Sequence, residues 1–246
     1  MASNILGGFF LIPIILIFPF FTKILFKFLG FIFTHLVSIL LYHPSLNLPL
    51  FLGKAIDGSF PLWSTILFAP LFKIFRAFSS IRRSRCRDAP YTEISQGLYV
   101  GGWPDSLEKL PPGDPAIVDC TCELPRNKWL HENSYLCIPT WDSRAPRIEQ
   151  IEVAVAWACE KRTHNTPVFI HCAHGHGRSV TVMCAVLVAL ELADDWKIAE
   201  KMIKEKRPCI YLNALHRAAL KEWTLKYDGI HSRCTSNKSP IAPTSS

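Results

Sequence analysis

The sequence predicts an α/β fold, with a small, mostly parallel central sheet flanked by helices, preceded by N-terminal transmembrane helices. The sheet and its helices follow from short apolar runs of strand length that alternate with helical patterns after residue 88. The membrane part follows from residues 5–42, which are almost wholly apolar, and from a second apolar region at 60–78. A transmembrane helix needs about 20 apolar residues, so we expect two or three membrane helices within residues 1–80.

The apolar N-terminal region offers three candidate spans, at residues 5–22, 24–41 and 60–78. A cleaved signal peptide does not fit, because no basic residue precedes the first stretch and the stretch is too long. A buried or amphipathic helix is the alternative for the first region. For 60–78, where Lys73 and Arg76 interrupt the apolar run, lying in the membrane interface is the alternative to spanning.

Residues 81–88 are expected to form a basic linker, because they contain Arg82, Arg83, Arg85 and Arg87. Under the positive-inside rule this flank predicts that the rest of the chain is cytosolic, next to a membrane crossed by a hairpin or by several spans. The arginines could also bind anionic lipid headgroups. The formal net charge of +7 would suit a nucleic-acid partner, but the adjoining membrane segments argue against that class. Nine scattered cysteines without paired spacing indicate reduced thiols in the cytosol.

Residues 89–230 are expected to form one α/β domain with its elements in alternating order. The sequence predicts strands at 94–102, 116–122 and 135–138, and a fourth that begins at Pro167. Helical periodicity predicts helices at 148–162, about 180–192, 196–206 and after residue 213. Asp194 or Asp195 is expected to cap the third of these helices. The tail at 231–246 is rich in Ser, Thr and Pro and is expected to be disordered.

The stretch from His171 to Ser179 organises this domain. Cys172 is followed by five residues and then by Arg178, between an apolar run upstream and a helical pattern downstream. A glycine-containing loop at a helix N-terminus directs backbone N–H groups and the positive end of the helix dipole to one point, which suits a phosphate dianion. Arg178 can bind two phosphate oxygens, and the same field lowers the pKa of Cys172 and favours a thiolate nucleophile. A small buried thiol is the alternative for Cys172. The predicted phosphate loop consists of Ala173, His174, Gly175, His176, Gly177 and Arg178.

With His171 before the cysteine, Gly-x-Gly inside the loop and Ser179 after the arginine, this motif resembles the active-site loop of the dual-specificity phosphatases, a family of the cysteine-dependent protein tyrosine phosphatase superfamily. The resemblance covers about residues 90–228. It implies a protein tyrosine phosphatase-like fold and a reaction through a cysteinyl-phosphate. It also implies that His171 orients Cys172, that Ser179 assists departure of the thiolate, and that no metal or other cofactor is required.

A general acid for this reaction is expected in the segment after the third strand. Expelling an alkoxide or phenoxide requires a proton, and Asp142 lies 30 residues before Cys172. The resemblance implies that a mobile loop at a similar distance carries the acid, with Trp141 packing to anchor it. An Asp that caps the following helix is the alternative. Glu149 and Glu152 are weaker rivals, because helical spacing places them on that helix.

Three features leave alternatives open. His174 and His176 are expected to point outward and shape the rim of the loop, although a His-x-His pair could also ligate zinc. Cys120 or Cys122 could protect the nucleophile through a reversible disulfide, or both could be plain buried thiols. Asn213 either caps the last helix or, as the resemblance allows, positions a water molecule in the site.

The sequence as a whole predicts a phosphatase that hydrolyses phosphate monoesters, with phosphoserine, phosphothreonine and phosphotyrosine of proteins as substrates. Phosphoinositides or phosphatidylglycerophosphate are the alternative substrates, which membrane attachment and the basic flank favour. The phosphate loop has no lysine, which lipid-acting relatives often carry. A phosphate-binding membrane protein without turnover and a redox sensor built on Cys172 are alternatives of other classes. The joint presence of Asp142 and Ser179 argues against both.

Overall fold

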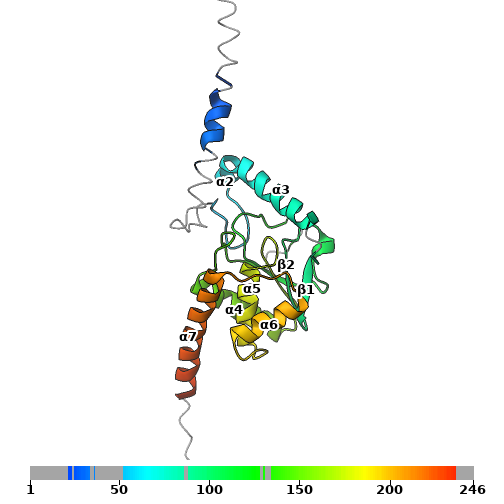
Figure 1. The fold of residues 1–246 in the computed structure, drawn as a ribbon, viewed down its shortest axis with the longest axis vertical. Helices are drawn as coiled ribbons and strands as arrows, with labels where there is room; N and C mark the ends of the chain where they lie inside the picture. The colour runs from blue at the N-terminus through cyan, green and yellow to red at the C-terminus, as the bar shows by residue number, and fades with distance from the viewer. Residues whose placement is uncertain are drawn as a thin grey trace, which may run out of the picture. The chain divides into compact units, whose positions relative to one another are not determined.

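The computed structural model describes residues 22–23, 25–33, 36, 52–85, 88–127, 130 and 134–236. The chain divides into two compact units, Met1–Leu48 and Pro49–Ser246, and the second contains the sheet (Figure 1). Its elements are α2 (Leu62–Leu67), α3 (Ala69–Arg85), β1 (Tyr91–Ser95), β2 (Leu98–Gly101), η2 (Leu107–Lys109), β3 (Ala116–Asp119), β4 (Tyr135–Cys137), α4 (Ile148–Thr163), β5 (Val168–His171), α5 (Arg178–Ala189), α6 (Trp196–Lys206) and α7 (Ala214–Ser236).

A five-stranded sheet in the order β1-β2-β5-β3-β4 forms the centre of the second unit. β1 and β2 form an antiparallel hairpin, whereas β2, β5, β3 and β4 are parallel neighbours. The parallel strands read as short apolar runs because both of their faces are covered, and every residue in them is buried. Their register aligns Gly101, His171, Asp119 and Cys137 at the carboxyl ends of the four strands.

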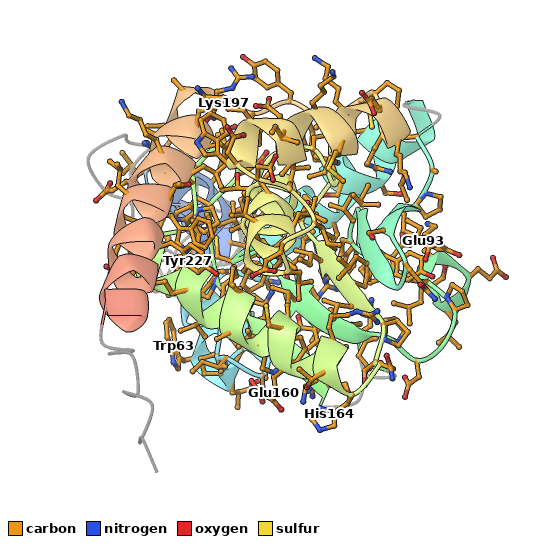
Figure 2. All side chains as sticks on the ribbon, turned by 90° about the horizontal axis from the view of Figure 1, so that it is seen from below. Trp63, Glu93, Glu160, His164, Lys197 and Tyr227 are labelled. Carbon is orange, nitrogen blue, oxygen red and sulfur yellow. The ribbon has the colours of Figure 1, made fainter. Side chains whose placement is uncertain are left out.

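Helices α4, α6 and α7 surround α5, which packs against β2 and β5. Residues from Arg178 to Leu187 of α5 are all buried, as expected for a helix that is apolar on every side. The core on this side of the sheet joins α5 to Val118, Ile170 and Trp223. Figure 2 shows side chains filling the space around α5, with Glu160 and His164 towards the outer end of α4.

The predicted helices are confirmed closely, and two of the predicted strands differ from the structure. Asp195 caps α6 by accepting hydrogen bonds from the backbone N–H groups of the first turn. The strand predicted at 94–102 is instead the β1–β2 hairpin, because Gly97 takes a φ of 69° and reverses the chain. The strand predicted at 116–122 ends at Asp119, whose side chain accepts a hydrogen bond of 2.7 Å from the backbone N–H of Thr121.

The segment from residue 52 to the end of α3 is packed into the same unit as the sheet. The Nζ atom of Lys54 lies 2.5 Å from a carboxylate oxygen of Asp119, and both side chains are fully buried. Lys54 lowers the pKa of Asp119 to about 2, against the burial that would raise it. Phe68, Leu71 and Phe72 are also buried, so this segment contributes to the core of the domain.

The expected transmembrane helices are not found in the described residues. No helix there combines the length and the apolar composition that crossing a bilayer requires. The segment 60–78 is not one span, since α2 ends and α3 begins at either side of Phe68. Residues 5–21 of the first predicted span, and residues 24, 34–35 and 37–41 of the second, lie outside the described residues. The predicted linker at 81–88 is helical as far as Arg85, and α7 continues to Ser236, within the predicted tail.

Candidate active site

The carboxyl ends of the parallel strands bring together the loops that hold the predicted site residues. Beyond the last paired residues, the backbone N–H of Cys172 donates to the carbonyl of Gly101 at 3.3 Å, and that of Cys120 donates to the carbonyl of His171 at 2.8 Å. The loops after β5, β3 and β4 therefore leave the sheet side by side. This edge is where parallel α/β sheets commonly bind their ligands.

The two glycines of the phosphate loop serve different purposes. Gly175 has a φ of 74°, and a Cβ there would lie 2.4 Å from a backbone carbon of Gly101, so both conformation and space require glycine. Gly177 has a φ of −125°, which other residues adopt. A Cβ at Gly177 would lie 2.6 Å from the ring of His216, so close packing is the reason for glycine at this position.

The sulfur of Cys172 receives two hydrogen bonds. The backbone N–H of Gly175 donates at 3.2 Å and the hydroxyl of Ser179 donates at 3.3 Å. Burial would raise the pKa of Cys172, but the charge of Arg178 and the hydrogen bond from Ser179 outweigh it and hold this pKa below its usual value. The site therefore favours a thiolate.

Arg178 is buried and held by a residue that the sequence analysis missed. Its Nη1 and Nη2 atoms donate to the two carboxylate oxygens of Glu123 at 3.0 and 2.8 Å, and Nη1 also donates to the carbonyl of Thr140 at 2.7 Å. This bidentate pair fixes the plane of the guanidinium. A buried carboxylate requires a partner, but nothing local in the sequence indicates that Glu123 pairs with Arg178, 55 residues away.

Asp142 lies in the loop after β4, next to Arg178. One of its carboxylate oxygens accepts a hydrogen bond of 3.2 Å from Nη2 of Arg178. Burial would raise the pKa of Asp142, but the charge of Arg178 outweighs this effect and lowers it. Trp141 is buried, and its ring centroid lies 6.3 Å from that of Phe75 in α3, which anchors the loop.

Two residues at the start of α7 hold the Asp142 loop. Asn213 accepts a hydrogen bond from the backbone N–H of His216 at 3.0 Å, as an N-cap residue does, and its side-chain amide donates to the carbonyl of Ser143 at 2.8 Å. Nε2 of His216, a residue that the sequence analysis did not single out, lies 2.9 Å from the carbonyl of Arg144. A hydrogen bond from the N-cap residue of α7 thus connects this helix to the Asp142 loop.

The three histidines of the motif have different surroundings. His171 is buried, its ring nitrogens find no hydrogen-bond partner among the described residues, and burial lowers its pKa to about 4. Nδ1 of His171 lies 3.9 Å from a carboxylate oxygen of Asp119, and the orientation of Cys172 by His171 stays a prediction. His174 does not point outward: it is 8% exposed, lines the pocket around Cys172, and burial lowers its pKa to about 4. His176 lies 3.0 Å from Asp88.

The alternative in which His174 and His176 form a zinc pair finds no ligand cluster that holds both of them among the described residues. The group that comes together instead is Asp88, His176 and Cys209, whose ligand atoms lie within 4.8 Å of one another. The hydrogen-bonding contact between His176 and Asp88 accounts for much of this proximity.

Arg207 holds the phosphate loop by donating hydrogen bonds to its backbone carbonyls. Its Nε donates to the carbonyl of Gly175 at 3.1 Å and its Nη2 to that of His174 at 3.3 Å. Nη1 donates to the carbonyl of Ala89 and to the hydroxyl of Thr92. These bonds hold loop carbonyls away from the sulfur, which leaves the pocket side to N–H groups. Arg207 was not among the predicted site residues.

Most, but not all, of the predicted site residues line one pocket of about 150 Å³, whose lining does not include His171, Ala173, Gly175 or Ser179. It includes Cys172, Arg178 and Asp142 together with Asn213 and His216. Arg82 of α3, which was expected in a linker, also lines this pocket.

Comparison with known proteins places this arrangement in a family. Residues 99–226 match the family described as "Dual specificity phosphatase, catalytic domain". The "Tyrosine-protein phosphatase yvh1" of Schizosaccharomyces pombe is 30% identical over 132 residues, which cover 50% of this chain and 38% of that protein. The "Dual specificity protein phosphatase 22-B" of Danio rerio is 30% identical over 95 residues, which cover 38% of this chain and 51% of that protein. The chain thus spans about half or less of these relatives.

A solved structure of PTPMT1 in complex with PI(5)P has the same fold. It is similar to this chain with a TM-score of 0.50 and 19% identity, covering 59% of this chain and 99% of that chain. The similarity at this identity concerns the fold alone.

Proposed function

The chain belongs to the dual specificity phosphatase family, and from this premise we propose that it is a cysteine-dependent phosphatase that hydrolyses phosphate monoesters through a cysteinyl-phosphate. One observation carries the proposal. The sulfur of Cys172 accepts hydrogen bonds from Gly175 and Ser179 in the same pocket that Arg178 and Asp142 line. A nucleophile, an anion-binding guanidinium and an acid thus meet in one place.

In the first step, the thiolate of Cys172 attacks phosphorus and the bond from phosphorus to the ester oxygen breaks. Arg178 and the loop N–H groups bind the non-bridging oxygens, and Asp142 gives its proton to the leaving oxygen. In the free protein Asp142 contacts Arg178. The incoming phosphate takes that place on the guanidinium, and its negative charge raises the pKa of Asp142, so that the carboxyl carries the proton it must donate.

In the second step, a water molecule attacks the cysteinyl-phosphate. Asp142 takes a proton from the water, the phosphorus–sulfur bond breaks, and inorganic phosphate leaves. The departing thiolate of Cys172 accepts the hydrogen bond of Ser179, which lies 3.3 Å away. Glu123, Asn213 and His216 act through their contacts with Arg178 and the Asp142 loop. Together with the loop N–H groups and one water molecule, these side chains supply the groups that the two steps need.

The substrate class that we propose first is phosphorylated Ser, Thr or Tyr of proteins. Both curated relatives are named as protein phosphatases of the tyrosine or dual-specificity type. Their names support this class.

Phospholipid headgroups are the second candidate, on a specific observation. Apolar side chains of α2 and α3 are exposed, among them Leu62, Ile66 and Ile74. In the sequence they come after an N-terminal region that is almost wholly apolar. An exposed apolar surface that continues such a region along the chain suits attachment to a membrane, with the catalytic unit on the cytosolic side.

Hydrolysis of p-nitrophenyl phosphate by the full chain in detergent, with EDTA present, tests the proposal. We expect turnover in the unaltered protein, none in Cys172→Ser, and a rate reduced by about 10²-fold or more in Asp142→Asn. The full chain is used, so that α3, whose Arg82 lines the pocket, is present. Folded protein that binds inorganic phosphate but hydrolyses nothing would make this a phosphate-binding protein instead.

A further inference from the structure

Helix α3 precedes the matched family domain, yet it forms a wall of the pocket. The ring of Phe75 lies 6.3 Å from that of Trp141 in the Asp142 loop, and the ring of Phe78 lies 6.4 Å from that of His174 in the phosphate loop. Arg82 lines the pocket itself. Positions 75, 78 and 82 share one helix face, so a single face of α3 contacts both catalytic loops.

The fold fixes α3 at this place. Leu71, Phe72 and Ser79 are buried on the helix, with 4–6% of each residue exposed. The chain just before α2 is held by the buried ion pair between Lys54 and Asp119, the last residue of β3. The packing of α3 on the domain therefore gives Arg82 a defined position at the pocket.

The charges around the pocket give Arg82 a distinct role. Burial lowers the pKa values of His174 and His216 to about 4, so both rings are neutral at pH 7. The charge of Arg178 is already paired with Glu123 at the buried end of the site. Arg82 is the second arginine among the described residues that line the pocket, and it is exposed to solvent. A second anionic group of a ligand would meet its guanidinium at the rim.

We propose that Arg82 binds an anionic group of the substrate next to the scissile phosphate, and that the protein therefore prefers phosphopeptides with an acidic or phosphorylated residue beside the phosphorylated one. This inference rests on the proposed phosphatase activity. Arg178 is 2% exposed whereas Arg82 lies at the surface, so the two guanidiniums stand at different depths. The phosphorylated side chain of a peptide reaches Cys172, while the side chain of the adjacent residue stays at the rim of the pocket. These two depths match the positions of Arg178 and Arg82. Guanidinium pairs strongly with carboxylates and phosphates.

The test compares Arg82→Ala with Arg76→Ala, which removes the same side chain from an exposed position of the same helix. Two phosphotyrosine peptides are used that differ only in Glu or Gln beside the phosphotyrosine, with p-nitrophenyl phosphate as a third substrate. In Arg82→Ala we expect KM for the Glu peptide to rise about tenfold with kcat nearly unchanged. KM for the Gln peptide and for the aryl phosphate should change less than about twofold. Arg76→Ala should leave all three unchanged.

The other outcomes each have a definite meaning. An equal loss on all three substrates would show that Arg82 serves the scissile phosphate, and would overturn the inference. A loss on a soluble dioctanoyl phosphoinositide without any change on the peptides would overturn the peptide class in favour of lipid headgroups. If the unaltered protein hydrolysed no aryl phosphate, the proposed function would fail together with the inference. Hydrolysis with no effect of Arg82→Ala would overturn the inference alone.

Discussion

Two cysteines at neighbouring strand ends have opposite properties. Cys120 comes directly after β3 and Cys172 directly after β5, and both are almost completely inaccessible to solvent. Burial, and then the proximity of Cys172, raise the pKa of Cys120 far above its usual value. The pKa of Cys172 is lowered, even though burial acts on it in the same direction as on Cys120.

The difference arises from the chain segment on the C-terminal side of each cysteine. After Cys172, the loop turns the N–H of Gly175 and the hydroxyl of Ser179 towards the sulfur, and Arg178 adds its charge. Cys120 lies in the same apolar core cluster as Cys172, but its chain continues into a turn in which Glu123 binds Arg178 and no donor to the Cys120 sulfur is found among the described residues. Burial alone thus makes an inert thiol, and a loop of donors makes a buried thiol reactive.

Replacing each of the two cysteines by alanine should give the largest difference in activity. We expect Cys172→Ala to lower kcat/KM for p-nitrophenyl phosphate by at least about 10³-fold, because the nucleophile is lost. Cys120→Ala should change kcat/KM less than about threefold and cost about 1 kcal/mol of stability, since it removes a small buried group. Steady-state kinetics and thermal unfolding measure both. If the two variants were equally stable and lost similar activity, the proposed difference between Cys172 and Cys120 would be wrong.

The partner of Arg178 provides the next test, because it holds the guanidinium whose charge lowers the pKa of Cys172. In Glu123→Gln, Arg178 loses a charged bidentate partner in a buried position, so we expect kcat/KM to fall by about 10- to 100-fold. Glu200→Gln is the matched control, since Glu200 pairs with Arg217 at a surface site with an N–O distance of 2.8 Å. That change should alter stability by less than about 1 kcal/mol and leave the rate as it is. Equal rates in the two variants would mean that Arg178 needs no such support.

Removing the hydroxyl of Ser179 should make Cys172 more like Cys120. We expect Ser179→Ala to lower kcat about tenfold and to let cysteinyl-phosphate accumulate, seen as a burst of product in rapid mixing. The thiolate forms as pH rises through the pKa of Cys172, which the hydrogen bond lowers. Its loss raises this pKa, so the pH of half-maximal alkylation by iodoacetamide should move upward. Thr224→Ala, which removes a hydroxyl bonded to the carbonyl of Leu220 within α7, should change neither quantity.

The parts of the site that are local in sequence could be predicted, and the parts that depend on strand order could not. The motif from Cys172 to Ser179 places its own donors, because the loop and the first turn of α5 are continuous. Glu123 reaches Arg178 only because β3 lies next to β5 in the sheet. β3 and β5 are neighbours because distant parts of the chain pair with each other. The hydrophobic periodicity of the sequence does not reveal such pairing.

The same reason explains why residues 60–78 were expected to form a membrane span. Apolar and basic residues in sequence suit both a membrane flank and an amphipathic helix packed on a domain. The contacts of Phe75 with Trp141 and of Phe78 with His174 show that one face of α3 packs against the domain, and both involve residues more than 60 positions away. The single strand predicted at 94–102 was wrong for a local reason, since Gly97 marked a turn that was missed.

The smallest expected effect concerns oxidation, where the two cysteines would act together. Cys120 and Cys172 come directly after paired residues of neighbouring parallel strands, which lie about 4.8 Å apart, a separation that a disulfide can bridge. Peroxide converts the Cys172 thiolate into a sulfenic acid, and the Cys120 thiol then condenses with it to a disulfide with release of water.

We expect dithiothreitol to restore most activity to the oxidised protein, and the restored fraction to fall several-fold in Cys120→Ala, because the sulfenic acid then proceeds to the irreversible sulfinic acid. Cys184→Ala, which removes another fully buried thiol, should recover like the unaltered protein. Poor recovery in Cys122→Ala instead would assign the protecting thiol to Cys122, whose sulfur lies 3.6 Å from a carboxylate oxygen of Glu123. Full recovery in all three variants would show that Cys172 is reduced without a partner, and that the inert cysteine beside it serves packing alone.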